Sequence, residues 1–447
     1  MKAIHISFIA AALSASASLH AAEEVNRFGR DTEVCDVCLI YSGDTSRPTW
    51  DADHLRPYLT HKYADGHREW FYDSFLFLEF HLGNSQLANA GAGQKAAVQS
   101  EWLQYLDNLF EEGHDLHQLD KMISEYKLEL GEPAMRHKVI ISTCCPAKDG
   151  SQGGAEWRDI NWGEVDGVKM NFALRSHRVK ATEWFIDEIA RRFEEEKFEN
   201  IDLAGIYWLE ESLFSNGDIM PTINRYIHNK GLRSYWIPYW ANNDQYAHEW
   251  YTLYKFDMAW RQPNYFFYDK VGGELTLPPY SQLTEAIEDS KRYGLGLELE
   301  FETQSTSNGM HEVSPTMHQR LNDYIDEFEK QGVWESAGVA HYSGTQGFYH
   351  MAQSSDPVNQ ATIDRLARIV ANRHKEWAGV ESIAVADSIQ FAYPGYGEIY
   401  ITADAPDAVC YNFNGVAVHY GNGRFKCPEG FYIVSDGKGN ASKVMVR

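Results

Sequence analysis

The sequence predicts a (β/α)₈ barrel followed by a small antiparallel β domain. Short apolar runs alternate with amphipathic helical patterns over most of the chain, and the pattern changes to short alternating runs near residue 380. Alternating strands and helices favour a parallel sheet covered by helices, and eight such units favour a closed barrel. The eight predicted strands are Val34–Ser42, Phe71–Leu82, Lys138–Cys145, Ile201–Glu211, Leu232–Trp240, Phe256–Gln262, Gly294–Glu302 and Gly338–Tyr342.

Helical patterns lie between or after these runs. An open doubly wound sheet is the structural alternative, but it would normally carry a Gly-rich phosphate turn after its first strand. Here Tyr41-Ser42-Gly43-Asp44 does not supply that turn. The clearest predicted helices are Ser176–Lys197, Asp218–Lys230, Ser281–Tyr293, Pro315–Gln331 and Gln360–His374.

Three segments follow from the whole pattern. Residues 1–22 are typical of a secretory signal, with Lys2 before an apolar stretch over Ile6–Leu19, which is too short to span a membrane. We therefore expect a secreted or periplasmic protein. Residues 30–378 form the predicted barrel, and residues 379–447 a predicted β-sandwich-like domain. The strands expected in that domain lie within Ile383–Phe391, Gly397–Ala403, Val409–Phe413 and Phe431–Val434.

Composition narrows the range of partners. The formal net charge of −24 argues against nucleic acid and anionic membranes, because both attract basic patches. Aromatic residues make up 14% of the chain, with 13 Trp and 26 Tyr. Most of these rings should pack in the core, but flat rings also line carbohydrate clefts because sugar C–H faces stack on them. The composition leaves the oligomeric state open.

The six cysteines indicate pairing rather than metal binding. In an oxidising compartment Cys410 and Cys427 are expected to form a disulfide between two C-terminal strands. Cys35 and Cys38 lie in a strand pattern whose odd spacing sends them to opposite faces, unlike a thioredoxin-type site. No ligand pairs recur at zinc spacing. We therefore predict no metal and no cofactor.

The strongest chemical signal is a row of glutamates in the seventh predicted strand. Strict alternation over residues 294–302 puts Glu298, Glu300 and Glu302 on one face and the leucines and Phe301 on the other. The apolar face must meet the helices, so the glutamates should point into the barrel. Buried carboxylates are costly unless they are paired or functional. The fourth strand ends in Glu210 and Glu211.

Two carboxylates that face each other across a cleft are the minimal apparatus for glycoside hydrolysis. The arrangement resembles the large clan of retaining-glycosidase barrels, in which the acid/base ends strand four and the nucleophile ends strand seven. That resemblance implies Glu211 or Glu210 as acid/base and Glu300 or Glu302 as nucleophile. The clan's usual Asn before the strand-four Glu is absent, because Leu209 and Glu210 occupy this stretch.

Polar and aromatic residues at the other strand ends suit a sugar site, because they combine stacking with hydroxyl hydrogen bonds. Core packing or loop bracing is the alternative for each of them. The predicted substrate-binding residues are Tyr41, Asp44, Trp208, Tyr239, Trp240, Asn242, Arg261, Gln262, Asn264, Tyr265, Glu298, His341 and Tyr342.

Three other interpretations remain open. The glutamates could form structural ion pairs with Arg or Lys inside the barrel. The barrel could bind glycans without cleaving them. Alternatively, a metal-assisted hydrolase could use Glu298, Glu300 or His81 with Ca²⁺ or another divalent ion.

Four motifs also resemble a secreted bacterial family described only as a domain of unknown function, itself similar to glycosidase barrels. The resemblance covers roughly residues 35–375 and implies the barrel and an extracellular carbohydrate role, without an established activity. The motifs are Gly205-Ile-Tyr-Trp-Leu-Glu-Glu, Trp236-Ile-Pro-Tyr-Trp, Arg261-Gln-Pro-Asn-Tyr-Phe-Phe and Gly296-Leu-Glu-Leu-Glu-Phe-Glu.

Overall fold

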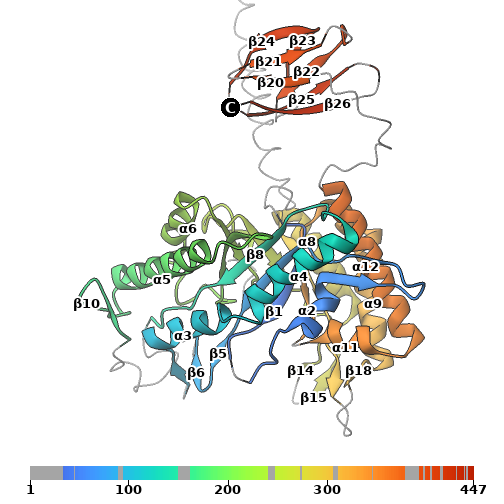
Figure 1. The fold of residues 1–447 in the computed structure, drawn as a ribbon. Helices are drawn as coiled ribbons and strands as arrows, with labels where there is room; N and C mark the ends of the chain where they lie inside the picture. Colours follow the sequence, from blue (N-terminus) through green and yellow to red (C-terminus); the bar gives the residue numbers. More distant parts are fainter. Residues whose placement is uncertain are drawn as a thin grey trace, which may run out of the picture. The chain divides into compact units, whose positions relative to one another are not determined.

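The protein is described by a computed structural model, in which the described residues before position 378 and those after position 391 form two compact units (Figure 1). The predicted signal segment and the predicted strand Ile383–Phe391 lie outside the described residues. These are 34–44, 46–88, 94–148, 162–239, 247–271, 274–305, 311–344, 346–377, 392–395, 398–402, 405–412, 416–428, 430–436, 438 and 441–446.

The first unit is a closed barrel of eight parallel strands with helices between them, so the predicted (β/α)₈ fold is confirmed. Each predicted run overlaps one barrel strand. Around the barrel the strands follow chain order, and β1 closes the ring by pairing with β19, from Asp36 against Val339 to Cys38 against His341. The strands are β1 (Asp36–Tyr41), β4 (Ser74–Leu78), β8 (His137–Ser142), β11 (Ile201–Trp208), β12 (Arg233–Trp236), β13 (Met258–Arg261), β16 (Gly296–Glu300) and β19 (Val339–Tyr342).

Helices connect the strands on the outside of the barrel (Figure 1). All five helices predicted from the sequence are confirmed, with ends that differ by a few residues. The helices are α2 (Ala52–Leu59), α3 (Gln99–Leu109), α4 (Asp115–Leu130), α5 (Arg175–Glu196), α6 (Met220–Asn229), α8 (Tyr280–Tyr293), α9 (Pro315–Lys330), α10 (Val333–Ser336), α11 (Gly347–Gln353) and α12 (Pro357–Trp377).

Local chemistry explains where the helices beside β16 begin and end. The Ser314 hydroxyl caps α9 by accepting the backbone N–H of Met317, and Pro315 occupies the first turn, where its missing N–H costs nothing. Gly294 ends α8 with a φ of 69°, a left-handed conformation that glycine adopts without strain. The chain then enters β16 at once, which fixes the position of the glutamate strand.

Several strands of two or three residues lie in the connections between barrel elements. They pair with one another and not with the barrel sheet. They are β2 (Thr60–Lys62), β3 (Arg68–Trp70), β5 (His81–Leu82), β6 (Ser85–Gln86), β7 (Lys95–Ala96), β9 (Glu164–Val165), β10 (Val168–Lys169), β14 (Asp269–Val271), β15 (Glu274–Thr276), β17 (Gln304–Ser305) and β18 (His311–Glu312).

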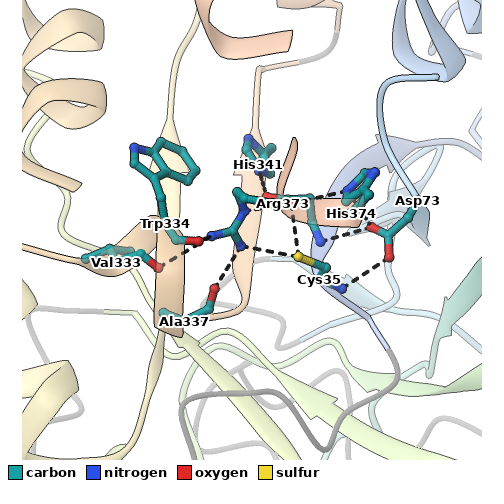
Figure 2. Close-up of polar contacts among 9 residues, drawn as sticks. Cys35, Asp73, Val333, Trp334, Ala337, His341, Arg373 and His374 are labelled. Atoms are coloured by element: carbon teal, nitrogen blue, oxygen red, sulfur yellow. Dashed lines mark hydrogen bonds and ion pairs between the residues drawn. The ribbon is translucent and has the colours of Figure 1, made fainter. Parts of the chain in front are cut away.

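A buried ion network ties the last helix, α12, to the closing strands of the barrel (Figure 2). The Arg373 guanidinium bonds the Asp36 carboxylate at 2.9 Å and donates to the backbone carbonyls of Trp334 and Ala337. His374 forms ion pairs with Asp36 at 3.2 Å and Asp73 at 3.3 Å. Two cations thus face two carboxylates in the interior, which compensates the cost of burying each charge.

The second unit contains two antiparallel sheets, ordered β20-β21-β24 and β23-β22-β25-β26. Their core includes Ile399, Ile401, Cys410, Val434 and Val444, which come from both sheets. The strands are β20 (Ala392–Gly395), β21 (Glu398–Ile401), β22 (Val409–Asn412), β23 (Ala417–Tyr420), β24 (Gly423–Lys426), β25 (Gly430–Ser435) and β26 (Ala441–Val446).

All six cysteines are free thiols in the structure, so the expected bond between Cys410 and Cys427 is not formed. Cys410 belongs to the core of the second unit, and the partly buried Cys427 packs against that core. Cys35, Cys38 and the Cys144–Cys145 pair are buried in the barrel unit. Among the described residues, no helix is long and apolar enough to cross a membrane.

Candidate active site

A cavity of about 200 Å³ lies at the carboxyl end of the barrel strands; we call it the mouth cavity. Every barrel strand except β8, or the loop that follows it, contributes to its lining. The cavity is therefore formed by convergence of segments far apart in the sequence, as in other barrels of this architecture. It is lined by Leu39, Tyr41, Leu78, Phe80, Tyr207, Glu211, Ile237, Tyr239, Gln262, Asn264, Phe267, Glu298, Glu300 and Tyr342.

Strand β16 presents its carboxylates to this cavity. Glu298 and Glu300 both line it, whereas Leu297 and Leu299 are fully buried on the opposite face. The predicted alternation of the seventh strand is therefore present in the structure. Among the described residues that line the mouth cavity, there is no Lys, Arg or His side chain to neutralise these acids.

Glu300 is held by an unusually complete set of donors. Its Oε1 accepts the backbone N–H of Asn264 at 3.0 Å, and its Oε2 accepts that of Tyr265 at 3.1 Å and the Tyr324 hydroxyl. The backbone N–H of Phe266 also contributes. Burial raises the pKa of Glu300 to about 7, and these hydrogen bonds to its charged form limit the rise.

Glu298 has a different environment, although it is only 3% exposed. No described residue supplies a hydrogen bond or ion pair to its carboxyl group. Burial, followed by the charges of Glu300 and Glu211, raises the pKa of Glu298 well above its usual value. Burial therefore favours the protonated form of Glu298 at pH values at which a solvent-exposed glutamate is ionised.

Glu211 enters the cavity from the loop after β11. It is half-buried, and its Oε1 accepts a hydrogen bond from the Gln262 side chain at 3.2 Å. Burial raises the pKa of Glu211, and the Gln262 bond opposes that rise. The Tyr41 and Tyr207 hydroxyls each feel the charges of both Glu211 and Glu298, so these two rings lie close to both carboxyl groups.

The two other glutamates proposed as catalytic point elsewhere. Glu210 is buried, and its Oε2 accepts a bond from the Asn216 side chain at 3.1 Å, while its backbone carbonyl accepts the Trp236 indole N–H. It braces the loops beneath the mouth. Glu302 lines a separate pocket formed by the loops after β16 and β19. Alternation continued from the inward-facing Tyr207 agrees with this result, because it places Glu211 on the face of Tyr207 and Glu210 on the face of Trp208.

Three predicted substrate-binding residues face the helices instead of the cavity. Trp208 is 2% exposed and follows Tyr207, which occupies the inward position on β11. Arg261 is buried against Asp289 of α8 at 3.5 Å. His341 is fully buried and bonds Asp36 at 2.8 Å. Each of these residues is next in the chain to a residue that faces the cavity. Because successive side chains of a strand point to opposite faces, a prediction that is wrong by one residue places the side chain on the wrong face.

Asp44 and Tyr265 brace loops beside the mouth without lining it. The Asp44 carboxylate accepts the backbone N–H groups of Ser46 and Gly83. The buried Tyr265 donates its hydroxyl to Asp323 at 2.7 Å. Two further predicted contacts, Trp240 and Asn242, lie outside the described residues.

The remaining predicted contacts line the cavity: Tyr41, Tyr239, Gln262, Asn264 and Tyr342. Tyr342 meets Tyr41 edge to face with ring centroids 6.0 Å apart. The sequence reasoning missed Tyr207, Phe80 and Phe267. Alternation would have found Tyr207, because the outward residues on either side of it leave it facing the barrel interior.

A metal would find its best donors away from the mouth. Among the described residues, Cys35, Asp36 and His374 are the single group with potential ligand atoms all within 4.8 Å of one another. Arg373 already supplies a cation there, bonding Asp36 and contacting the Cys35 sulfur at 3.4 Å. Burial also raises the pKa of the Cys35 thiol, which disfavours the thiolate that binds metals. His81, proposed as a ligand, pairs with Glu79 at 3.2 Å.

Fold and site together define a (β/α)₈-barrel protein with an acidic, aromatic-lined mouth. The chain belongs to the family described as Domain of unknown function (DUF4855), whose model matches residues 36–368. No curated protein matches the sequence.

Solved structures that resemble the chain include other barrels at low identity. A mutant tryptophan synthase α-subunit from Pyrococcus furiosus is 8% identical, covers 77% of this chain and 98% of its own, and has a TM-score of 0.30. An intracellular xylanase from Thermoanaerobacterium saccharolyticum is 12% identical, with coverage of 69% and 85% and a TM-score of 0.36. A xylanase and alpha-amylase inhibitor protein from Scadoxus multiflorus is 11% identical, with coverage of 76% and 98% and a TM-score of 0.33. The fold assignment rests on the strand order of the barrel itself.

Proposed function

We propose that the protein is a glycoside hydrolase that cleaves a polysaccharide or oligosaccharide with a pair of glutamates. One observation carries the proposal: Glu211 from the loop after β11 and Glu298 from β16 share one small cavity with Tyr41, Tyr207 and Tyr342. Two carboxyl groups from separate strands, beside rings on which a sugar can stack, match what glycosidic cleavage requires.

Glu211 and Glu298 fit the pair better than Glu211 and Glu300. The Glu300 oxygens accept three backbone N–H groups and a tyrosine hydroxyl, which occupies the lone pairs that a nucleophile or base needs. Glu298 receives no such bonds from the described residues. Glu300 is then the residue that positions the loop after β13.

The environments of the two acids favour distinct roles. Burial and the charges of Glu300 and Glu211 raise the pKa of Glu298 well above its usual value, so Glu298 holds its proton more firmly than an ordinary glutamate and would donate it to the glycosidic oxygen. Glu211 is half-buried and bonded to Gln262, so its carboxylate is the form available to attack the anomeric carbon or to activate water. This assignment reverses the order of roles in the retaining-glycosidase clan, where the strand-four glutamate is the acid/base.

The walls of the mouth cavity favour an uncharged sugar. Its described lining offers tyrosine rings and hydroxyls and the amides of Gln262 and Asn264, and no basic side chain to hold a uronate or a sulfate. The chain's net charge of −24 also repels polyanions. A neutral glycan is therefore the proposed substrate and partner.

The test is release of reducing ends by purified protein from a panel of neutral polysaccharides, namely xylan, mannan, galactan, arabinan, chitin and α- and β-glucans. We expect wild type to act on at least one. Glu211→Gln and Glu298→Gln should each lower the rate by roughly 10²–10⁴-fold. Binding without release at any pH would instead support the alternative of a non-catalytic glycan-binding barrel. Loss of release on chelation would support metal-assisted hydrolysis.

An activated leaving group separates the roles of the two acids. The dinitrophenolate of a 2,4-dinitrophenyl glycoside of the responsive sugar departs without protonation. Glu298→Gln should therefore release it with a kcat/KM close to that of wild type, whereas Glu211→Gln should not. The opposite result would favour the clan-like order of roles. Proton NMR of the first product shows whether the anomeric configuration is retained, which decides whether Glu211 attacks carbon or activates water.

We also propose that the protein works outside the cytoplasm, as a secreted or periplasmic enzyme. The proposal rests on the basic and then apolar pattern of the first 22 residues. N-terminal sequencing of the protein from its native host should find a mature chain that starts near Glu23. An intact Met1 would contradict this.

A further inference from the structure

A second pocket lies beside the mouth cavity; we call it the outer pocket. Its volume is about 580 Å³, and its lining includes Glu302, Thr303, His311, Ser343, Gln346 and His350. These residues follow β16 and β19 or lie on α11, so they belong to the same end of the barrel as the mouth. The size lies within the range of ligand-binding pockets.

The outer pocket adjoins the mouth cavity through residues that lie one or two positions apart at two strand ends. Tyr342 lines the mouth and Ser343 the outer pocket; Glu300 lines the mouth, and Glu302 the outer pocket. Burial raises the pKa of Tyr342, and the charge of Glu302 raises it further. Glu302 therefore lies close to the Tyr342 hydroxyl. A ligand that leaves the mouth past Tyr342 therefore meets Glu302 first.

The chemistry of the outer pocket suits hydroxyl groups and not anions. The imidazoles of His311 and His350 stack with centroids 3.6 Å apart and planes within 6°. Burial, together with His311 and His54, lowers the pKa of His350 to about 4, so its ring is neutral at physiological pH. No Lys or Arg is among the described lining residues.

One lining group also lacks the partner that a buried amide requires. The side-chain nitrogen of Gln346 is buried and has no hydrogen-bond partner among the described residues. A buried donor that has no hydrogen-bond acceptor costs roughly 1–3 kcal/mol. A ligand hydroxyl in the outer pocket would supply the missing acceptor.

We propose that the outer pocket is a further sugar-binding subsite, so that the substrate is a neutral glycan chain extending from the mouth cavity past Tyr342 to His350. This inference rests on the proposed function and names the form of its substrate. Sugar rings would pack against the histidine pair, and their hydroxyl groups would form hydrogen bonds with Glu302 and Gln346. An enzyme built this way cleaves longer chains faster than short ones.

The test compares chain lengths in wild type, His350→Ala and Gln346→Ala, with the exposed His67→Ala as a matched control. Oligosaccharides from the disaccharide to the hexasaccharide of the responsive glycan are the substrates. In wild type and His67→Ala, kcat/KM should rise at least tenfold with length. In the two pocket variants, kcat/KM should increase threefold or less with chain length. Cleavage of the aryl monosaccharide glycoside, which fills only the mouth cavity, should remain unchanged in these variants.

A binding measurement covers the case in which no polysaccharide is cleaved. Cello-, xylo-, manno- and chito-oligosaccharides are titrated into Glu211→Gln while the imidazole proton resonances of His311 and His350 are followed by NMR. Saturable shifts with the longer chains of one series support the subsite. Where a glycan is cleaved, equal rates for all chain lengths would overturn the subsite and leave the hydrolase proposal standing. Where none is cleaved, binding that perturbs only the mouth tyrosines would overturn the subsite and favour the non-catalytic barrel. If no oligosaccharide binds, both proposals fail.

Discussion

Glu300 accepts the backbone N–H of Asn264 in a 3.0 Å hydrogen bond, and Asn264 has the left-handed φ of 49°. Few residues other than glycine adopt that conformation readily, and asparagine is one of them. The carboxylate thereby fixes a sharp turn after β13. Gln262 and Asn264 on either side of Pro263 then face the mouth cavity.

Replacing Glu300 with Gln should therefore destabilise the protein. The amide nitrogen of Gln would face a backbone N–H donor, and an unmatched buried donor costs about 1–3 kcal/mol. Urea denaturation measures the loss of unfolding free energy. Tyr324→Phe, which removes only the hydroxyl donor, should cost less. If Glu300→Gln unfolds at the same urea concentration as wild type, Glu300 does not hold this turn.

The neighbours Glu210 and Glu211 should respond differently to the same change. Glu210→Gln keeps a carbonyl oxygen that can accept the Asn216 bond, so the activity should fall less than tenfold, with an unchanged pH profile. Glu211→Gln should lower kcat by roughly 10²–10⁴-fold. Measuring the rate of cleavage of the responsive glycan over a range of pH checks both expectations. A larger loss in Glu210→Gln, with an altered pH profile, would exchange their roles.

Activity should have a pH optimum nearer to neutral than two ordinary carboxyl groups would give. Glu211 must be ionised and Glu298 protonated, and burial raises the pKa of both. Activity should thus fall as the pH drops through the pKa of Glu211 and as it rises through that of Glu298. In Glu298→Gln, assayed on the dinitrophenyl glycoside, the alkaline fall should disappear. Its persistence would assign that limb to another group.

Stability should decline at alkaline pH because of His374. The carboxylates of Asp73 and Asp36 outweigh burial and raise its pKa from 6.5 to about 9. A raised pKa in the folded state stabilises the fold fully below pH 6.5, and that contribution is lost as pH rises through 9. The expected change is on the order of 3 kcal/mol. Urea denaturation at both ends of this pH range measures the change in unfolding free energy. In His374→Gln most of this change should disappear. If the variant loses as much stability as wild type over the same range, His374 is not the cause.

Thiol titration should count six free cysteines in unreduced, denatured protein. In the native state Cys427 should react first, because it is partly exposed and the other five thiols are buried. Ellman's reagent and mass spectrometry of the modified peptides supply the measurement. A count of four would show a disulfide that the structure does not contain.

Local sequence patterns alone specify the barrel and the inward face of its seventh strand. Strand and helix periods are local properties, so the eight runs and the helix over residues 315–330 are visible without tertiary contacts. The same alternation placed Glu298 and Glu300 on one face, because leucines at the intervening positions must meet the helices.

Tertiary structure decided which carboxyl groups remain available. Glu298 and Glu300 look equivalent in the sequence, yet the loop after β13 donates its backbone N–H groups only to Glu300. Likewise, Arg261 and His341 belong to strands that end at the mouth, but their partners Asp289 and Asp36 come from α8 and β1. Hydrogen bonds between segments far apart in the chain leave no local pattern, so only the folded protein reveals them.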